Sequence, residues 1–118
     1  MCIRDSANTS SIASIEYAVA HLGVKLIVVL GHQSCGAVSA AIAGGDNGHN
    51  LNHLVAHLQP ALQACPGGSV DAVVRENAVQ TAAALAERSQ VIGEAAKGDL
   101  EIIPAWYVLE TGHVEYLK

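Results

Sequence analysis

The pattern of apolar and polar positions divides the chain into short helical and extended stretches. In the first helical stretch, apolar residues recur every three or four positions, as in a helix buried along one side. These residues are Ile12, Ile15, Val19 and Leu22. We expect Ser10 or Ser11 to cap this helix and Gly23 to end it. Residues 25–30 then form a short apolar run rich in β-branched residues, which predicts a strand buried on both faces of a parallel sheet.

Four further helical stretches and a terminal hairpin complete the pattern. The predicted helices span residues 34–43, 51–64, 69–89 and 90–97. Pro60 falls inside the second of these and predicts a kink or break near Leu58. Residues 100–108 and 114–117 predict two strands of a hairpin, and Pro104 predicts an edge position or a bulge for the first strand.

This order of elements predicts one α/β domain, with a parallel-sheet core flanked by helices and a C-terminal hairpin. The domain would cover residues 11–118, and residues 1–10 would be an unstructured or non-native leader. A chain of 118 residues is long enough for one hydrophobic core and too short for two.

Charge and cysteine content narrow the class of partner and the compartment. Six Lys and Arg against eleven Asp and Glu, with no basic cluster, argue against nucleic acid and against an anionic membrane surface. The longest apolar run is too short to span a membrane, and no signal-peptide pattern opens the chain. Three widely spaced cysteines do not make a disulfide framework, so we expect a reducing, cytoplasmic location.

His32 and Cys35 are the candidate chemical residues, because they follow directly after the predicted strand 25–30. Ligands of open α/β sheets bind outside the carboxyl ends of the strands, where these two side chains would lie. Imidazole and thiolate are both zinc ligands, and the amino end of the following helix favours a thiolate. Gly36 leaves room for close approach of a small molecule and is the candidate substrate contact. The pair also permits a thiol-dependent enzyme, with Cys35 as nucleophile and His32 as base.

Three more histidines, His49, His53 and His57, recur at intervals of four residues. Histidines at this spacing share one side of a helix and can bind zinc. Their side lies opposite the leucine-rich face of the same stretch, so we favour an exposed polar face. On the long helix, Asn77 falls on the apolar face and predicts a buried polar group that hydrogen-bonds a loop near the site.

Several segments together resemble the β-class carbonic anhydrases, in the order in which that family has them. They are Ser-Ile-Glu-Tyr-Ala-Val at 14–19, Leu-Gly-His-Gln-Ser-Cys-Gly-Ala-Val at 30–38, Val-Arg-Glu-Asn-Ala-Val-Gln at 74–80, and the closing hairpin at 103–114. The resemblance implies a zinc enzyme that hydrates carbon dioxide reversibly to bicarbonate. It also implies that His32 and Cys35 are two of three protein ligands, and that a partner subunit helps to line the site, as in a homodimer or larger homo-oligomer.

The family's first ligand is a Cys in a Cys-x-Asp-Ser-Arg segment, and this sequence does not contain that segment. We therefore expect an N-terminally incomplete domain. Cys2, Arg4 and Asp5 have a similar composition but a different spacing, and we favour their belonging to an unrelated leader. On the alternative interpretation, Cys2 is the third zinc ligand and Arg4 and Asp5 form a substitute for the family's Asp–Arg pair. If neither holds, the chain is a catalytically incomplete binding or assembly module.

Overall fold

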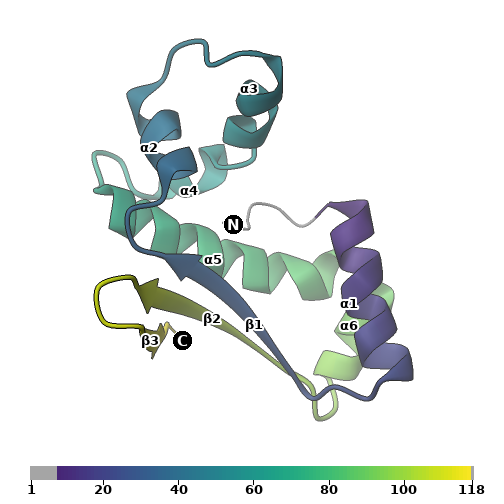
Figure 1. Cartoon of the computed structure of the whole chain (residues 1–118). Helices are drawn as coiled ribbons and strands as arrows, with labels where there is room; N and C mark the ends of the chain where they lie inside the picture. The colour runs from purple at the N-terminus through teal and green to yellow at the C-terminus, as the bar shows by residue number, and fades with distance from the viewer. Residues whose placement is uncertain (1–7, 118) are drawn as a thin grey trace.

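The computed structural model describes residues 8–117, which form a mixed sheet with helices packed against it (Figure 1). The helices are α1 (Thr9–His21), α2 (Gly36–Ala43), α3 (His49–Ala56), α4 (Gln59–Ala64), α5 (Val70–Arg88) and α6 (Gln90–Ala96). The strands are β1 (Leu26–His32), β2 (Glu101–Val108) and β3 (His113–Tyr116). Among the described residues, no helix is both long and apolar enough to cross a membrane.

The sheet has the order β1-β2-β3. Strands β1 and β2 pair in parallel, from Leu26 opposite Glu101 to His32 opposite Tyr107. The return from β1 to β2 runs through helices α2 to α6, as a parallel pair requires a long crossover. Strands β2 and β3 form an antiparallel hairpin. The predicted α/β class, the parallel pair and the C-terminal hairpin are therefore confirmed.

The prediction that Pro104 lies in an edge strand was wrong. Pro104 occupies the middle strand, opposite Val29 of β1. The Pro104 carbonyl accepts a hydrogen bond from the Leu117 amide at 2.8 Å, just beyond the end of β3. Because the carbonyl and the nitrogen of one residue in a strand point to the same side, the Pro104 nitrogen also faces away from β1. The missing N–H therefore costs no bond to β1, and the proline is tolerated for the same reason as on an edge.

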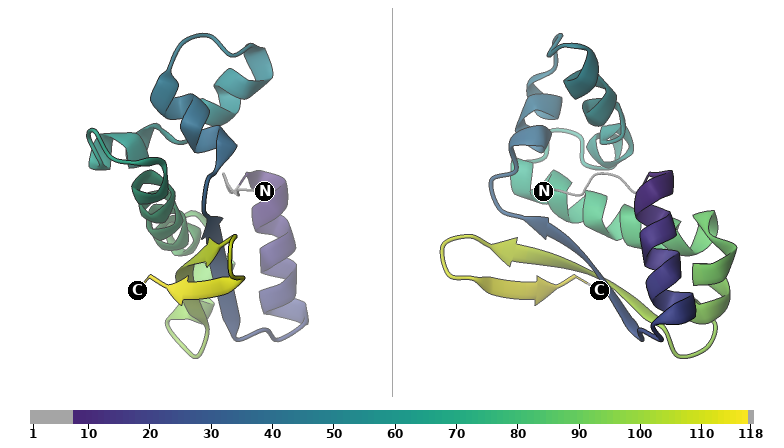
Figure 2. Two further views of the ribbon diagram at one scale, coloured as in Figure 1. Left: turned by 60° about the vertical axis from the view of Figure 1, so that its left-hand side comes forward. Right: turned by 45° about the vertical axis from the view of Figure 1, so that its right-hand side comes forward.

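Helix α5 packs along one face of the sheet, and Gly31 permits the close approach (Figure 2). A Cβ at Gly31 would lie 2.6 Å from Cγ1 of Val74, which leaves no room for a side chain. Two buried clusters form along this face. The site cluster contains Cys35, Val38, Ala41, Leu58, Ala61, Val73, Val74 and Trp106. The support cluster contains Ile12, Leu85, Ile92 and Leu100.

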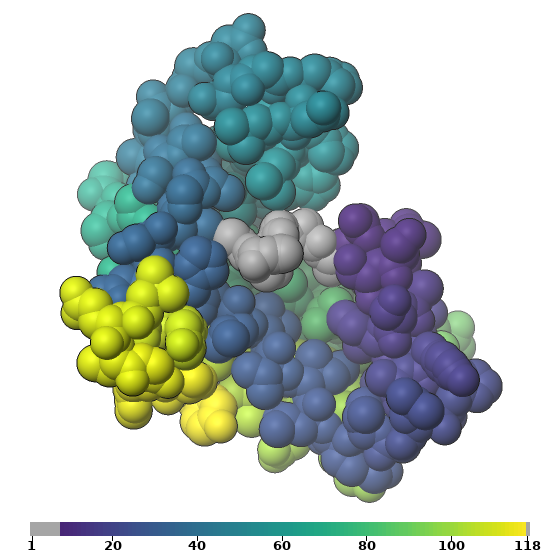
Figure 3. Space-filling model, in the orientation of Figure 1, coloured from purple at the N-terminus to yellow at the C-terminus, as the bar shows by residue number. Residues whose placement is uncertain are grey.

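The opposite face of β1 is exposed, which corrects the prediction of a strand buried on both faces. Leu26, Val28 and Leu30 are 50%, 41% and 40% exposed, whereas Ile27 and Val29 pack against the support cluster. In the space-filling view, side chains of β1 reach the surface between α1 and the hairpin (Figure 3). The sequence predicted burial on both faces because every residue from Leu26 to Leu30 is apolar. Within residues 8–117, however, helices cover only one face of β1.

The starts of two helices differ from the predictions, and one predicted helix break is confirmed. Helix α1 begins at Thr9, and its cap is Asn8, whose Oδ1 accepts from the Ser11 amide at 2.9 Å; the predicted serine caps were wrong. The stretch 51–64 divides into α3 and α4 near Leu58, as Pro60 predicted. Helix α2 begins at Gly36 and not at Ser34, because Ser34 has a φ of 57°, outside helical geometry.

Candidate metal centre

The loop that follows β1 is anchored on two sides. The Gln33 amide donates to the Tyr107 carbonyl at 3.0 Å, and its side-chain oxygen accepts from the Leu109 amide at 3.0 Å. The Ser34 amide donates to Oδ1 of Asp71 at 3.2 Å, in the first turn of α5. These bonds hold Ser34 in its left-handed conformation and fix where the residues on either side of it point.

His32 and Cys35 lie at the two ends of this loop and line the same pocket, as predicted for the carboxyl end of β1. Cys35 is 2% exposed and precedes the first turn of α2, whose unpaired N–H groups favour negative charge nearby. His32 is half-buried, and its Nδ1 lies 3.0 Å from the Gln33 carbonyl oxygen. Because a carbonyl only accepts, Nδ1 is the donor of this bond, and in the neutral ring the lone pair that a metal requires is on Nε2.

The pocket beside these two residues is small and mostly apolar. The volume open to the centre of a water molecule is about 20 Å³, which suits one or a few atoms. Its walls come from β1, α2, α3, the residues just before α4, and α5. Leu54 and Leu58 form one wall, and Asn77 and Thr81 supply polar groups from α5. Asn77 therefore faces the pocket and is half-buried; its predicted bond to a loop stays a prediction.

The two donors fit zinc in type: one imidazole nitrogen with a fixed tautomer and one buried thiol. A catalytic zinc ion takes three protein ligands and leaves one position for water. Among residues 8–117, no group of three His, Cys, Asp or Glu side chains is placed to hold a metal. For such a set, the described part of the chain would supply two ligands, His32 and Cys35.

Of the four other predicted site residues, the structure describes only Gly36. Cys2, Arg4 and Asp5 lie outside the described residues, so their roles stay predictions. Gly36 is exposed, a Cβ there would meet no atom within 4 Å, and it is not among the residues that line the pocket. Its predicted substrate contact has no geometric support in the described residues.

Two residues that the sequence reasoning did not single out support the site. Asp71 holds the loop after β1 through the Ser34 amide. The sequence feature that could have pointed to Asp71 is an acidic residue in the first turn of a helix. Arg75 stacks on the Trp106 ring, with its guanidinium carbon 3.9 Å from the ring centroid, and so ties α5 to β2. No spacing rule connects these pairs, because they meet only through tertiary packing.

Comparisons with known proteins agree with this geometry. The family model of carbonic anhydrases matches residues 2–114. "Carbonic anhydrase 2" of Mycobacterium tuberculosis is 40% identical over 113 residues, which cover 89% of this chain and 55% of that protein. The crystal structure of the β-carbonic anhydrase CafA of Aspergillus fumigatus superposes with a TM-score of 0.78 and 30% identity, over 97% of this chain and 58% of that one.

A further match is one of two tetrameric β-carbonic anhydrases of Sordaria macrospora, with a TM-score of 0.76 and 28% identity, over 98% of this chain and 63% of that one. Both structures share with this chain the mixed sheet flanked by helices, over most of its length. The chain belongs to the β-class carbonic anhydrase family. It spans about half the length of the relatives it matches, 55% of the Mycobacterium tuberculosis protein.

Proposed function

We propose that the protein catalyses the zinc-dependent reversible hydration of carbon dioxide to bicarbonate, and that His32 and Cys35 are two of the three protein ligands of the zinc ion. The observation that carries the proposal is the placement of both side chains on one small apolar pocket at the carboxyl end of β1. Membership of the carbonic anhydrase family supports the reaction type.

Each residue has a defined part in this proposal. A bound zinc ion would supply hydroxide at neutral pH by acidifying a water molecule. The Gln33 carbonyl orients the His32 ring through Nδ1, and Asp71 holds the Ser34 amide between the two ligands. The apolar walls, including Leu54, Leu58 and Val38, exclude bulk water and suit a small apolar gas molecule.

Zinc content after reconstitution tests the proposal. We expect the purified chain to bind zinc at this site and Cys35→Ser to lose that zinc, while Cys65→Ser retains it as the matched control. Cys65 contacts Ala72 and not the pocket. Unchanged zinc binding in Cys35→Ser would overturn the ligand assignment, and carbon dioxide hydration measured on the zinc-loaded chain tests the reaction itself.

The third ligand is a separate part of the proposal. If Cys2 completes the set, Cys2→Ser loses zinc as Cys35→Ser does. If zinc binding depends on Cys35 and not on Cys2, another group supplies the third ligand. If the chain binds no zinc after reconstitution, the alternative applies, and the chain is a catalytically incomplete binding or assembly module.

We further propose a cytoplasmic homo-oligomer. The structural relative from Sordaria macrospora is tetrameric, and the exposed apolar face of β1 is a surface that assembly would cover. Sedimentation analysis tests the oligomeric state, and a monomer at micromolar concentration would contradict it.

A further inference from the structure

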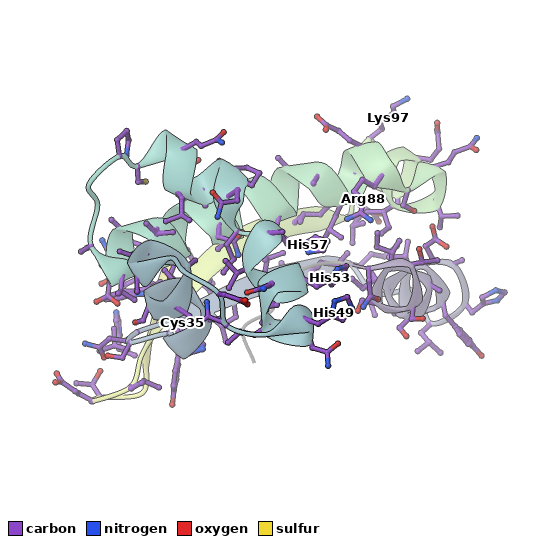
Figure 4. All side chains as sticks on the ribbon, turned by 90° about the horizontal axis from the view of Figure 1, so that it is seen from above. Cys35, His49, His53, His57, Arg88 and Lys97 are labelled. Carbon is purple, nitrogen blue, oxygen red and sulfur yellow. The ribbon has the colours of Figure 1, made fainter. Side chains whose placement is uncertain are left out.

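The three histidines of α3 take no part in the proposed zinc site. His49, His53 and His57 are exposed, which confirms the predicted polar face. Figure 4 shows them projecting from one side of α3, away from Cys35. None of them lines the pocket, although Leu54 and Leu58, next to them in sequence, do.

His53 and His57 stand at the separation that a shared metal ion requires. Their ring centroids are 4.9 Å apart, with an angle of 66° between the ring planes. Two imidazoles that bind one zinc ion through nitrogens at about 2 Å, in tetrahedral geometry, place their centroids roughly 5 Å apart. Because the His53 ring is exposed, it is free to turn about χ2 towards an ion shared with His57, without a movement of the helix.

A backbone hydrogen bond orients the His57 ring. Its Nδ1 lies 2.9 Å from the backbone carbonyl oxygen of His53. Because the carbonyl can only accept, Nδ1 is the donor of this bond, and the lone pair of the neutral ring is on Nε2. Metal-binding histidines in proteins are oriented in the same way, by donation from the other ring nitrogen.

We propose that His53 and His57 form a second metal site, separate from His32 and Cys35, that takes a divalent transition-metal ion such as Zn²⁺, Ni²⁺ or Co²⁺. Two imidazoles suit this class of ion, and water completes its coordination. In residues 8–117 no third His, Cys, Asp or Glu is placed to join them, so the ion is exchangeable.

Such an ion would stabilise the end of α3. The helix contributes no buried residue of its own, and His57 is its C-cap. An ion held by His53 and His57 would span the last turn of α3. Leu54, which lies in this turn, and Leu58, which follows it, both line the pocket. The second site thus fixes the wall opposite the candidate metal centre.

Titration with cobalt chloride separates the two sites. Calorimetry counts the bound ions, and the thiolate-to-cobalt charge-transfer absorption reports occupancy of the Cys35 site alone. We expect His53→Gln and His57→Gln to lose one calorimetric binding event, with affinity falling on the order of 100-fold, and to retain the charge-transfer signal. Circular dichroism checks that each variant is folded.

His113→Gln and His21→Gln are matched controls, because these histidines lie on other elements. Both should bind cobalt as the wild type does, and so should His49→Gln. Equal cobalt binding by His57→Gln and the wild type would overturn the proposal, and so would loss of the binding event in His49→Gln. Failure of the proposed function would show instead as absence of the charge-transfer signal, which leaves the His53–His57 event measurable.

Discussion

The site cluster and the support cluster lie along the same helix and the same face of the sheet, yet they differ in composition. The support cluster is made of large aliphatic side chains, such as Leu85 and Ile92, from α5 and α6. The site cluster consists mostly of Ala, Val and Cys residues, together with Leu58 and Trp106, and it adjoins a small pocket. Large side chains fill space completely, whereas small ones at the carboxyl ends of the parallel strands leave room for a ligand.

Polar groups differ between the two clusters as well. Beside the support cluster, buried Ser89 caps α6, and its hydroxyl donates to Glu16 of α1, which joins the two helices. Near the site cluster, Asp71 accepts from the Ser34 amide and the Gln33 side chain accepts from the Leu109 amide, and both bonds anchor the loop between His32 and Cys35. One set of polar groups fixes helices, and the other fixes a loop. The comparison therefore separates residues that serve stability from residues that serve the site.

The largest effect is expected in the support cluster. Ile92 is fully buried, so Ile92→Ala should lower the free energy of unfolding by about 2–5 kcal/mol through lost burial and a cavity. Zinc stoichiometry of the folded fraction should not change. Val91→Ala, at a 40% exposed neighbour, is the control and should stay within about 0.5 kcal/mol. Urea unfolding measures both, and a loss of zinc in folded Ile92→Ala would contradict the separation.

Gly31→Ala should destabilise the site side by about 1–3 kcal/mol, because the new methyl group pushes Val74 and α5 away from β1. Since His32 follows directly, zinc affinity should fall with it. Gly36→Ala has open space around its Cβ and should leave the free energy of unfolding within about 0.5 kcal/mol. Thermal unfolding compares the two glycines, and equal stability would show that α5 adjusts freely.

Ser89→Ala should cost about 1–2 kcal/mol, since it removes the cap on the Ile92 amide and leaves Glu16 without this donor. The exposed Ser10→Ala serves as the control, with a change of about 0.5 kcal/mol or less. Chemical denaturation gives both values. If Ser89→Ala and Ser10→Ala agreed, the buried bond would contribute nothing to joining α1 with α6.

Asp71→Ala should weaken zinc binding about tenfold, the lower end of the effect of losing a supporting hydrogen bond at a metal site. Asp71→Asn keeps an oxygen acceptor for the Ser34 amide and should retain most of the affinity. Competition with a zinc chelator measures this difference. Identical affinities for the two variants would show that the loop holds its shape without the bond.

The smallest effect concerns Asp46, in the loop before α3. Hydrogen bonds from the Gly48 amide and the Asn52 side chain lower the pKa of Asp46 below its ordinary 3.8. The folded state therefore binds this proton less readily than the unfolded chain, so the stabilisation is present above pH 3.8 and is lost as pH falls through the folded-state pKa. Asp46→Asn should reduce the melting temperature slightly at pH 7, and the difference from the wild type should shrink as the pH falls below 3.8 and through the folded-state pKa. A difference that does not change with pH across this range would contradict this origin.

Much of the fold could be predicted from local patterns. The helical period, the strand predicted over residues 25–30 and the break near Pro60 each depend on neighbouring residues, and the structure contains all three, with the strand continuing to His32. The pairing of His32 with Cys35 was also readable, because both follow one strand at the carboxyl end of a parallel sheet. Periodicity and strand order are local or nearly local properties, so the sequence carries them directly.

Only the tertiary structure decided which face of β1 is covered and what holds the loop. Leu26 and Ile27 are both aliphatic, but one faces solvent and the other faces α5 and α6. Asp71 reaches Ser34 across 37 positions, and Arg75 meets Trp106 across two elements. The sequence determined the elements and pointed to the two candidate ligand residues, His32 and Cys35. Tertiary packing determined the pocket beside them, because contacts between residues far apart in the sequence depend on how the helices pack against the sheet.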